Sequence, residues 1–185
     1  MGKRAVVVLA EGFEEIEAVT PIDVLRRAGV EVTVAGVSGT TVRGAHGVSF
    51  GCDATLAAVT FAPDAIVLPG GLPGAENLGA SAVVRDRVLQ VRDAGGVCAA
   101  ICAAPAFTFA RYGLLDGRRA TCYPGFEHHF PPGTQASDER VVVDGRIVTS
   151  RGPGTALEFS LTLVDLLTGA DAARGLGQGM LAKGN

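Results

Sequence analysis

The chain has 185 residues, 48% of them hydrophobic, which is enough for one domain with a sizeable buried core. A net charge of −3 without a basic stripe argues against nucleic acid as a partner, and no apolar run approaches the roughly 20 residues of a membrane span. The four cysteines show no paired zinc spacing. We expect a single cytoplasmic domain over residues 1–185, with free thiols, no metal or cofactor, and neither a nucleic-acid nor a membrane partner.

Short apolar runs alternate with helical patterns, as in an α/β sheet that is covered by helices on both faces. A helix is predicted over residues 14–28 and should end at Gly29, with Pro21 either kinking it or opening a segment capped by Thr20. Buried parallel strands are predicted at residues 4–9, 31–35, 65–68 and 97–101. We therefore expect a doubly wound, mostly parallel sheet.

The last third of the chain carries two further signals. Asp144-Gly145 lies between two β-branched runs and predicts a two-residue hairpin turn at one side of the sheet. Thr155 and Glu158 are expected to form a capping box before a helix so apolar that it is either deeply buried or at an interface. Only the glycine-rich tail, residues 174–185, looks loosely specified.

Cys102 lies where the predicted strand 97–101 runs into the helix-like stretch 103–110. Its small neighbours allow a sharp turn that projects the thiol from the strand end toward the free N–H groups of the helix start. The helix N-terminus is expected to lower the thiol pKa from about 8.5 toward roughly 3.5–7.5, which favours a nucleophilic thiolate. The alternative is a cysteine that fills the core, which is our expectation for Cys98.

Three loops follow predicted strands, and ligand sites of doubly wound sheets lie outside the carboxyl ends of strands. In the acidic loop 11–17, either one carboxylate faces inward or the acids only stabilise a helix N-terminus. The glycines of loop 68–74 permit a tight turn whose N–H groups point at a ligand. Loop 149–155 could bind an anion, although a plain turn is favoured.

Four segments, residues 11–17, 68–71, 99–105 and 149–155, resemble the ThiJ/PfpI superfamily, in the branch of the DJ-one-like and YajL-like deglycases. The resemblance covers almost the whole chain and implies a flavodoxin-like fold. It implies that Cys102 is the reactive cysteine and that Glu17 is the protonated carboxyl bonded to it. By the same resemblance, Gly70, Gly71 and Ala103 form an oxyanion-binding cradle of backbone N–H groups.

The resemblance implies chemistry at Cys102 on small α-oxoaldehydes such as methylglyoxal, with Glu17 moving protons. Lactate would come from the free aldehyde, in a glutathione-independent glyoxalase, or from glycated protein and amine adducts, in a deglycase. The alternative is an oxidative-stress sensor or redox-regulated chaperone in which Cys102 is oxidised to sulfinate. A cysteine protease is less expected, because Ala103 stands where that branch carries a histidine.

Tyr123 departs from the family pattern, since eukaryotic members commonly have a histidine before the corresponding proline. With a pKa of about 10, tyrosine is a poor base, so Tyr123 is expected to position the substrate. His128 and His129 follow, most simply in a solvated loop. The resemblance also implies a homodimer, with Arg27 reaching toward the active site across or near the interface.

Overall fold

The computed structural model describes residues 2–182. Its centre is a seven-stranded sheet with the strand order β10-β11-β7-β6-β1-β2-β5. Neighbouring strands are parallel except for the antiparallel pair β10–β11 at one edge. The strands are β1 (Arg4–Leu9), β2 (Glu31–Gly36), β5 (Ala54–Thr55), β6 (Ala65–Leu68), β7 (Val97–Ile101), β10 (Val141–Asp144) and β11 (Ile147–Ser150). Apart from the short β5, the parallel strands have the flavodoxin order, so the predicted fold class is confirmed.

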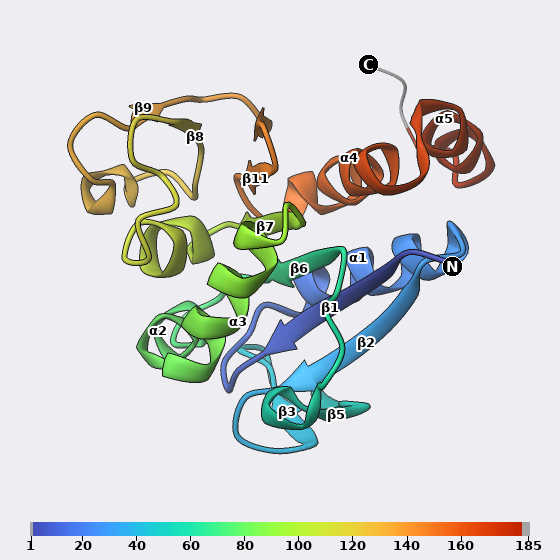
Figure 1. The fold of residues 1–185 in the computed structure, drawn as a ribbon, viewed down its shortest axis with the longest axis horizontal. Coiled ribbons are helices and arrows are strands. Elements are labelled where there is room, and N and C mark those ends of the chain that lie inside the picture. Colours follow the sequence, from blue (N-terminus) through green and yellow to red (C-terminus); the bar gives the residue numbers. More distant parts are fainter. Residues whose placement is uncertain (1, 183–185) are drawn as a thin grey trace.

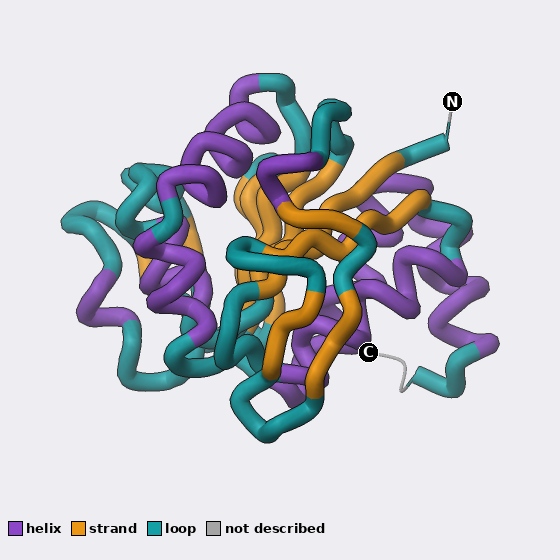
Figure 2. The backbone as a smooth tube through the Cα atoms, turned by 90° about the horizontal axis from the view of Figure 1, so that it is seen from below, coloured by secondary structure: helices purple, strands orange, loops and turns teal. Residues whose placement is uncertain are grey.

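Helices cover both faces of this sheet (Figures 1 and 2). On one face α1 (Glu15–Arg27) packs beside α4 (Ala156–Thr168), which packs beside α5 (Ala170–Gly179). On the other face lie α2 (Gly74–Ala80) and α3 (Ala82–Asp93). Short elements complete the fold: β3 (Thr41–Arg43), β4 (Ser49–Gly51), β8 (Arg119–Ala120), β9 (Gln135–Ala136), the π-helix η2 (Pro105–Phe109), and the 3-10 turns η1 (Leu56–Ala58), η3 (Glu127–His129) and η4 (Pro153–Thr155).

The central strands are apolar along their whole length because both of their faces are buried. Every residue of β6 and β7 is buried, and so is every residue of β1 after Arg4. α1 agrees with its predicted extent, with Glu14 as N-cap and Gly29 following at φ +77°. It continues through Pro21, so the helix does not restart at Thr20.

The predicted hairpin is present, but its turn is shifted by one residue. Asp144 still pairs with Ile147 in the ladder, so the two turn residues are Gly145 and Arg146. Gly145 has a φ of +62°, a conformation that glycine adopts without steric cost. Asp144, which we expect in the turn from the sequence, therefore belongs to the β-ladder.

The predicted capping box at α4 is wrong. The Thr155 hydroxyl donates to the Gly152 carbonyl oxygen at 2.8 Å, whereas Glu158 pairs with Arg140 at 2.7 Å. The tail is also more ordered than predicted, because α5 extends to Gly179 and packs against α4; residues 183–185 lie outside the described residues. None of the helices in the described part of the chain is long and apolar enough to cross a membrane.

Candidate active site

Cys102 lies directly after β7, at the carboxyl edge of the parallel sheet. Its φ of +64° is unusual for a residue with a side chain, and it produces the sharp turn that the sequence predicted. The Cys102 N–H donates to the Ser150 carbonyl oxygen, and the Cys102 carbonyl oxygen accepts from the Tyr123 N–H, both at 2.8 Å. The residue is 8% exposed. The backbone thus fixes a thiol that is almost, but not fully, closed off from solvent.

Glu17 brings a carboxyl group to this thiol from the first turn of α1. The residue is fully buried, and its Oε2 accepts from the Gly70 N–H at 2.8 Å. Its other oxygen, Oε1, is buried without an oxygen or nitrogen partner among residues 2–182. The Cys102 thiol lies close enough to this carboxyl for the two groups to shift each other's pKa. A proton on Glu17 can therefore be donated to the sulfur.

The two groups strongly affect each other's protonation. Burial raises the pKa of Glu17 to about 7, with a smaller contribution from the charge of Glu14. Burial, and then Glu17, raise the pKa of the Cys102 thiol, and the N–H groups of Gly71 and Ala103 only partly oppose this. The predicted net lowering of the thiol pKa is therefore wrong: the N–H groups of Gly71 and Ala103 lower this pKa, but burial and Glu17 raise it by more. A thiolate at Cys102 is favoured only while Glu17 holds a proton.

The glycines after β6 allow their loop to approach both the start of α1 and the turn after β7. A Cβ on Gly70 would lie 2.7 Å from Cys102 Cβ, 2.8 Å from Glu17 Oε2 and 2.9 Å from Ala103 N. Gly71 has a φ of +85°, and its N–H and that of Ala103 lower the pKa of the nearby thiol. The structure thus brings together Cys102, Glu17, Gly70, Gly71 and Ala103.

Tyr123 lies beside this site. The residue is 46% exposed, and its ring lies close to Gly152. A Cβ on Gly152 would lie 3.3 Å from Tyr123 Cδ2 and 4.0 Å from Glu17 Oε1, so this glycine borders the pocket too. For the loop that contains Gly152, residues 149–155, the sequence favours a plain turn. The only feature that indicates a site there is that the loop follows a strand, β11.

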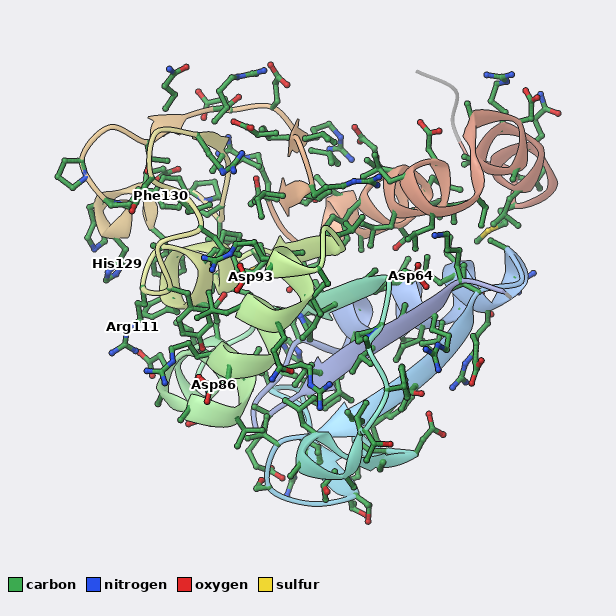
Figure 3. The ribbon with its side chains drawn as sticks, viewed as in Figure 1. Asp64, Asp86, Asp93, Arg111, His129 and Phe130 are labelled. Carbon is green, nitrogen blue, oxygen red and sulfur yellow. The ribbon has the colours of Figure 1, made fainter. Side chains whose placement is uncertain are left out.

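Arg27 and the two histidines are not brought to the pocket within one chain. Arg27 lies ten residues beyond Glu17, about 15 Å along α1, where it pairs with Asp23 at 2.7 Å. The His128 ring is hydrogen-bonded to the Gly125 carbonyl oxygen at 2.7 Å. His129 packs on the Phe107 ring with centroids 4.8 Å apart, at the periphery of the molecule (Figure 3).

Glu14 is a buried acid that sequence reasoning did not single out. The residue is 7% exposed, and its Oε2 accepts from the Glu17 N–H at 2.7 Å, capping α1. Atoms of Glu14, Glu15 and His46 lie within 4.8 Å of one another, but Glu15 is hydrogen-bonded to the His46 ring and Glu14 is used as the cap. These contacts account for the cluster without an ion.

Cys98 is a core residue, as predicted.

A cysteine at a strained strand-to-helix turn, beside a buried carboxyl and two backbone N–H groups, defines a class of α/β proteins with a nucleophile elbow. Comparison with known proteins identifies the family within this class. The model of the DJ-1/PfpI family matches residues 3–166. The chain therefore belongs to the DJ-1/PfpI family.

Several relatives support this assignment. Protein dj-1beta of Drosophila melanogaster is 41% identical over the whole of both chains. Protein DJ-1 homolog B of Arabidopsis thaliana is 46% identical over 92% of this chain, which spans only 40% of that longer protein. The glutathione-independent glyoxalase DJR-1.2 of Caenorhabditis elegans is 37% identical over 94% of each chain. The solved structure of Toxoplasma gondii DJ-1, oxidized, has a TM-score of 0.94 at 40% identity and covers 97% of this chain and 98% of its own.

Proposed function

We propose that the protein converts α-oxoaldehydes to hydroxy acids without glutathione, as a glyoxalase on free methylglyoxal or as a deglycase on early glycation adducts. The observation that carries this proposal is that Cys102, the buried carboxyl of Glu17 and the Ala103 N–H meet around Gly70, where the thiol and the carboxyl shift each other's pKa. The similarity to a glutathione-independent glyoxalase supports it. Catalytic roles for Cys102 and Glu17 are part of the proposal.

In the first step the Cys102 thiolate, present while Glu17 holds the proton that the pair shares, forms a bond to the aldehyde carbon of methylglyoxal. The carbonyl oxygen takes up the electron pair of the broken π bond, and a proton from Glu17 completes the hemithioacetal. Backbone N–H groups of Gly71 and Ala103 stabilise the negative oxygen as it forms. A pKa of about 7 suits Glu17 to this task, because the group can both give and accept a proton near neutral pH.

The ionised Glu17 then removes the proton from the former aldehyde carbon and returns it to the neighbouring carbon through an enediol. This internal redox change oxidises the first carbon and reduces the second, leaving a thioester of lactate on Cys102. Water hydrolyses the thioester, so one methylglyoxal and one water give one lactate and the free thiol. On a glycated amine or thiol, the original amine or thiol would be released as well. Tyr123, beside the site, would position the substrate.

The test is lactate formation from methylglyoxal without glutathione. Native protein should turn over, Cys102→Ser should be inactive, and Glu17→Gln should lose at least about a hundredfold in kcat, the usual scale of a general acid–base contribution. Cys98→Ser is the matched control because Cys98 is buried in the core, away from the pocket. Equal rates for native protein and Cys102→Ser would refute the proposal.

A second function uses the same pocket, because N–H donors beside a sulfur also suit a cysteine sulfinate. Cys102 would be oxidised by peroxide, and the chain would act as an oxidative-stress sensor or redox-regulated chaperone. The similarity to an oxidised DJ-1 structure favours this candidate. Mass spectrometry after graded peroxide would test it: Cys102 must oxidise before Cys52 and Cys122, and equal oxidation of the three would exclude a sensor.

We also propose that the chain forms a homodimer. Three exposed apolar side chains, Ile16, Val19 and Val48, gather around the first half of α1, where the Val48 N–H donates to Glu15 at 3.4 Å. Covering them with a second copy would remove apolar surface from water next to the pocket. The reach of Arg27 across such an interface and the cytoplasmic location both stay predictions.

A further inference from the structure

Glu14 is linked to the reactive pair by a closed ring of hydrogen bonds. Its N–H donates to the Gly70 carbonyl oxygen at 2.9 Å, the Gly70 N–H donates to Glu17 Oε2 at 2.8 Å, and the Glu17 N–H donates to Glu14 Oε2 at 2.7 Å. The ring fixes the Glu17 carboxyl against the loop that carries the Gly71 N–H. Glu14 therefore helps to fix the positions of both Glu17 and the loop of Gly70 and Gly71, which lie next to Cys102.

Glu14 also places a negative charge beside the pair. The charge of a buried acid opposes the appearance of another negative charge nearby. The titratable groups facing Glu14 are Glu15, on α1, and His46, from the loop between β3 and β4, which are hydrogen-bonded to each other at 2.8 Å. Those facing Glu17 are Glu14 and Cys102, with the Tyr123 phenol ring nearby.

We propose that Glu14 is a positioning residue of the Cys102 site. Through the ring it aligns the Glu17 carboxyl against Gly70, and its charge adds to the effect of burial in favouring the protonated form of Glu17. The inference rests on the proposed function in one respect, namely that Glu17 and Cys102 act together in catalysis. The ring and the proton equilibrium can be measured whether or not lactate is formed.

The test is the pH dependence of Cys102 alkylation by iodoacetamide, followed in the full chain by mass spectrometry of the peptide that contains Cys102. Glu14→Gln keeps an acceptor for the Glu17 N–H and removes the charge. Because loss of a nearby negative charge favours deprotonation, the midpoint of the profile should move to lower pH. Glu14→Asp keeps both the charge and a good N-cap, so its profile should match that of native protein.

Glu15→Gln is the control, because it removes the same charge one residue away, from a side chain directed to His46; its midpoint should not move. If Glu14→Gln does not fold, Glu14→Ser is the second neutral variant that can cap the helix, with the same expected shift. An unchanged midpoint in the neutral variant, or an equal shift in Glu15→Gln, would overturn the proposal. A shifted midpoint without any lactate formation would refute the proposed function and leave this inference standing.

Discussion

At the scale of single residues, Glu17 and Cys102 titrate as a pair, because both are buried and each shifts the other's pKa. Burial disfavours charge on either group, so the pair retains a proton where exposed groups of the same types would have lost one. That retained proton is the one the proposed reaction moves.

The raised pKa of Glu17 has a consequence for stability. The carboxyl ionises near 4.5 in the unfolded chain but only near about 7 in the folded chain. Between these values the folded state binds more protons, so the free energy of unfolding falls as the pH rises, by on the order of 3 kcal/mol in total. Urea unfolding should show native protein losing stability relative to Glu17→Gln across this range. A constant difference between the two would contradict the raised pKa.

Gly70 is the residue at which a single added methyl group should disrupt the site. The new Cβ would lie within 3.0 Å of Cys102, Glu17 and the Ala103 backbone nitrogen, so at least one of them would have to shift. Gly70→Ala should cost about 1–3 kcal/mol of stability and strongly slow the alkylation of Cys102. Gly154→Ala is the control, because a Cβ there meets nothing within 4 Å. Similar alkylation rates in the two variants would show that the close approach at Gly70 is not required.

At the scale of elements, the pocket forms where loops after β1, β6 and β7 meet near the point at which the strand order reverses. The sequence predicted these strands because strands buried on both faces must be apolar throughout. It also predicted Cys102 from its place between a strand and a helix, and Glu17 by resemblance. It missed Glu14 and Gly152 because their roles depend on contacts between loops distant in sequence. It misjudged the Cys102 pKa because the degree of burial is a property of the assembled fold.

The helix α4 anchors one helical layer, and its two faces should respond differently to truncation. Leu163 is fully buried, whereas Leu161 is partly exposed near α5. Leu163→Ala should cost about 2–5 kcal/mol, because it removes buried methyl groups and leaves a cavity. Leu161→Ala should cost clearly less. Equal losses in urea unfolding would mean that α4 packs with a different face toward the sheet.

At the scale of the whole molecule, the proposed homodimer makes a separate prediction. Val48→Glu places a charge in the exposed apolar group near α1 and should shift the protein toward the monomer in light scattering after size exclusion. Val83→Glu is the control, because Val83 is similarly exposed but lies on α3, on the opposite face of the sheet. Loss of the dimer in both variants, or in neither, would argue against an interface at Val48.

The most direct measurement of the central claim is the number of lactate molecules formed per chain from methylglyoxal, with the oxidation state of Cys102 determined in the same sample. If Cys102 is a nucleophile that is regenerated in each cycle, lactate should exceed the protein many-fold while Cys102 remains a thiol. Lactate that stops at or below one molecule per chain, or that forms equally with Cys102→Ser, would contradict the claim.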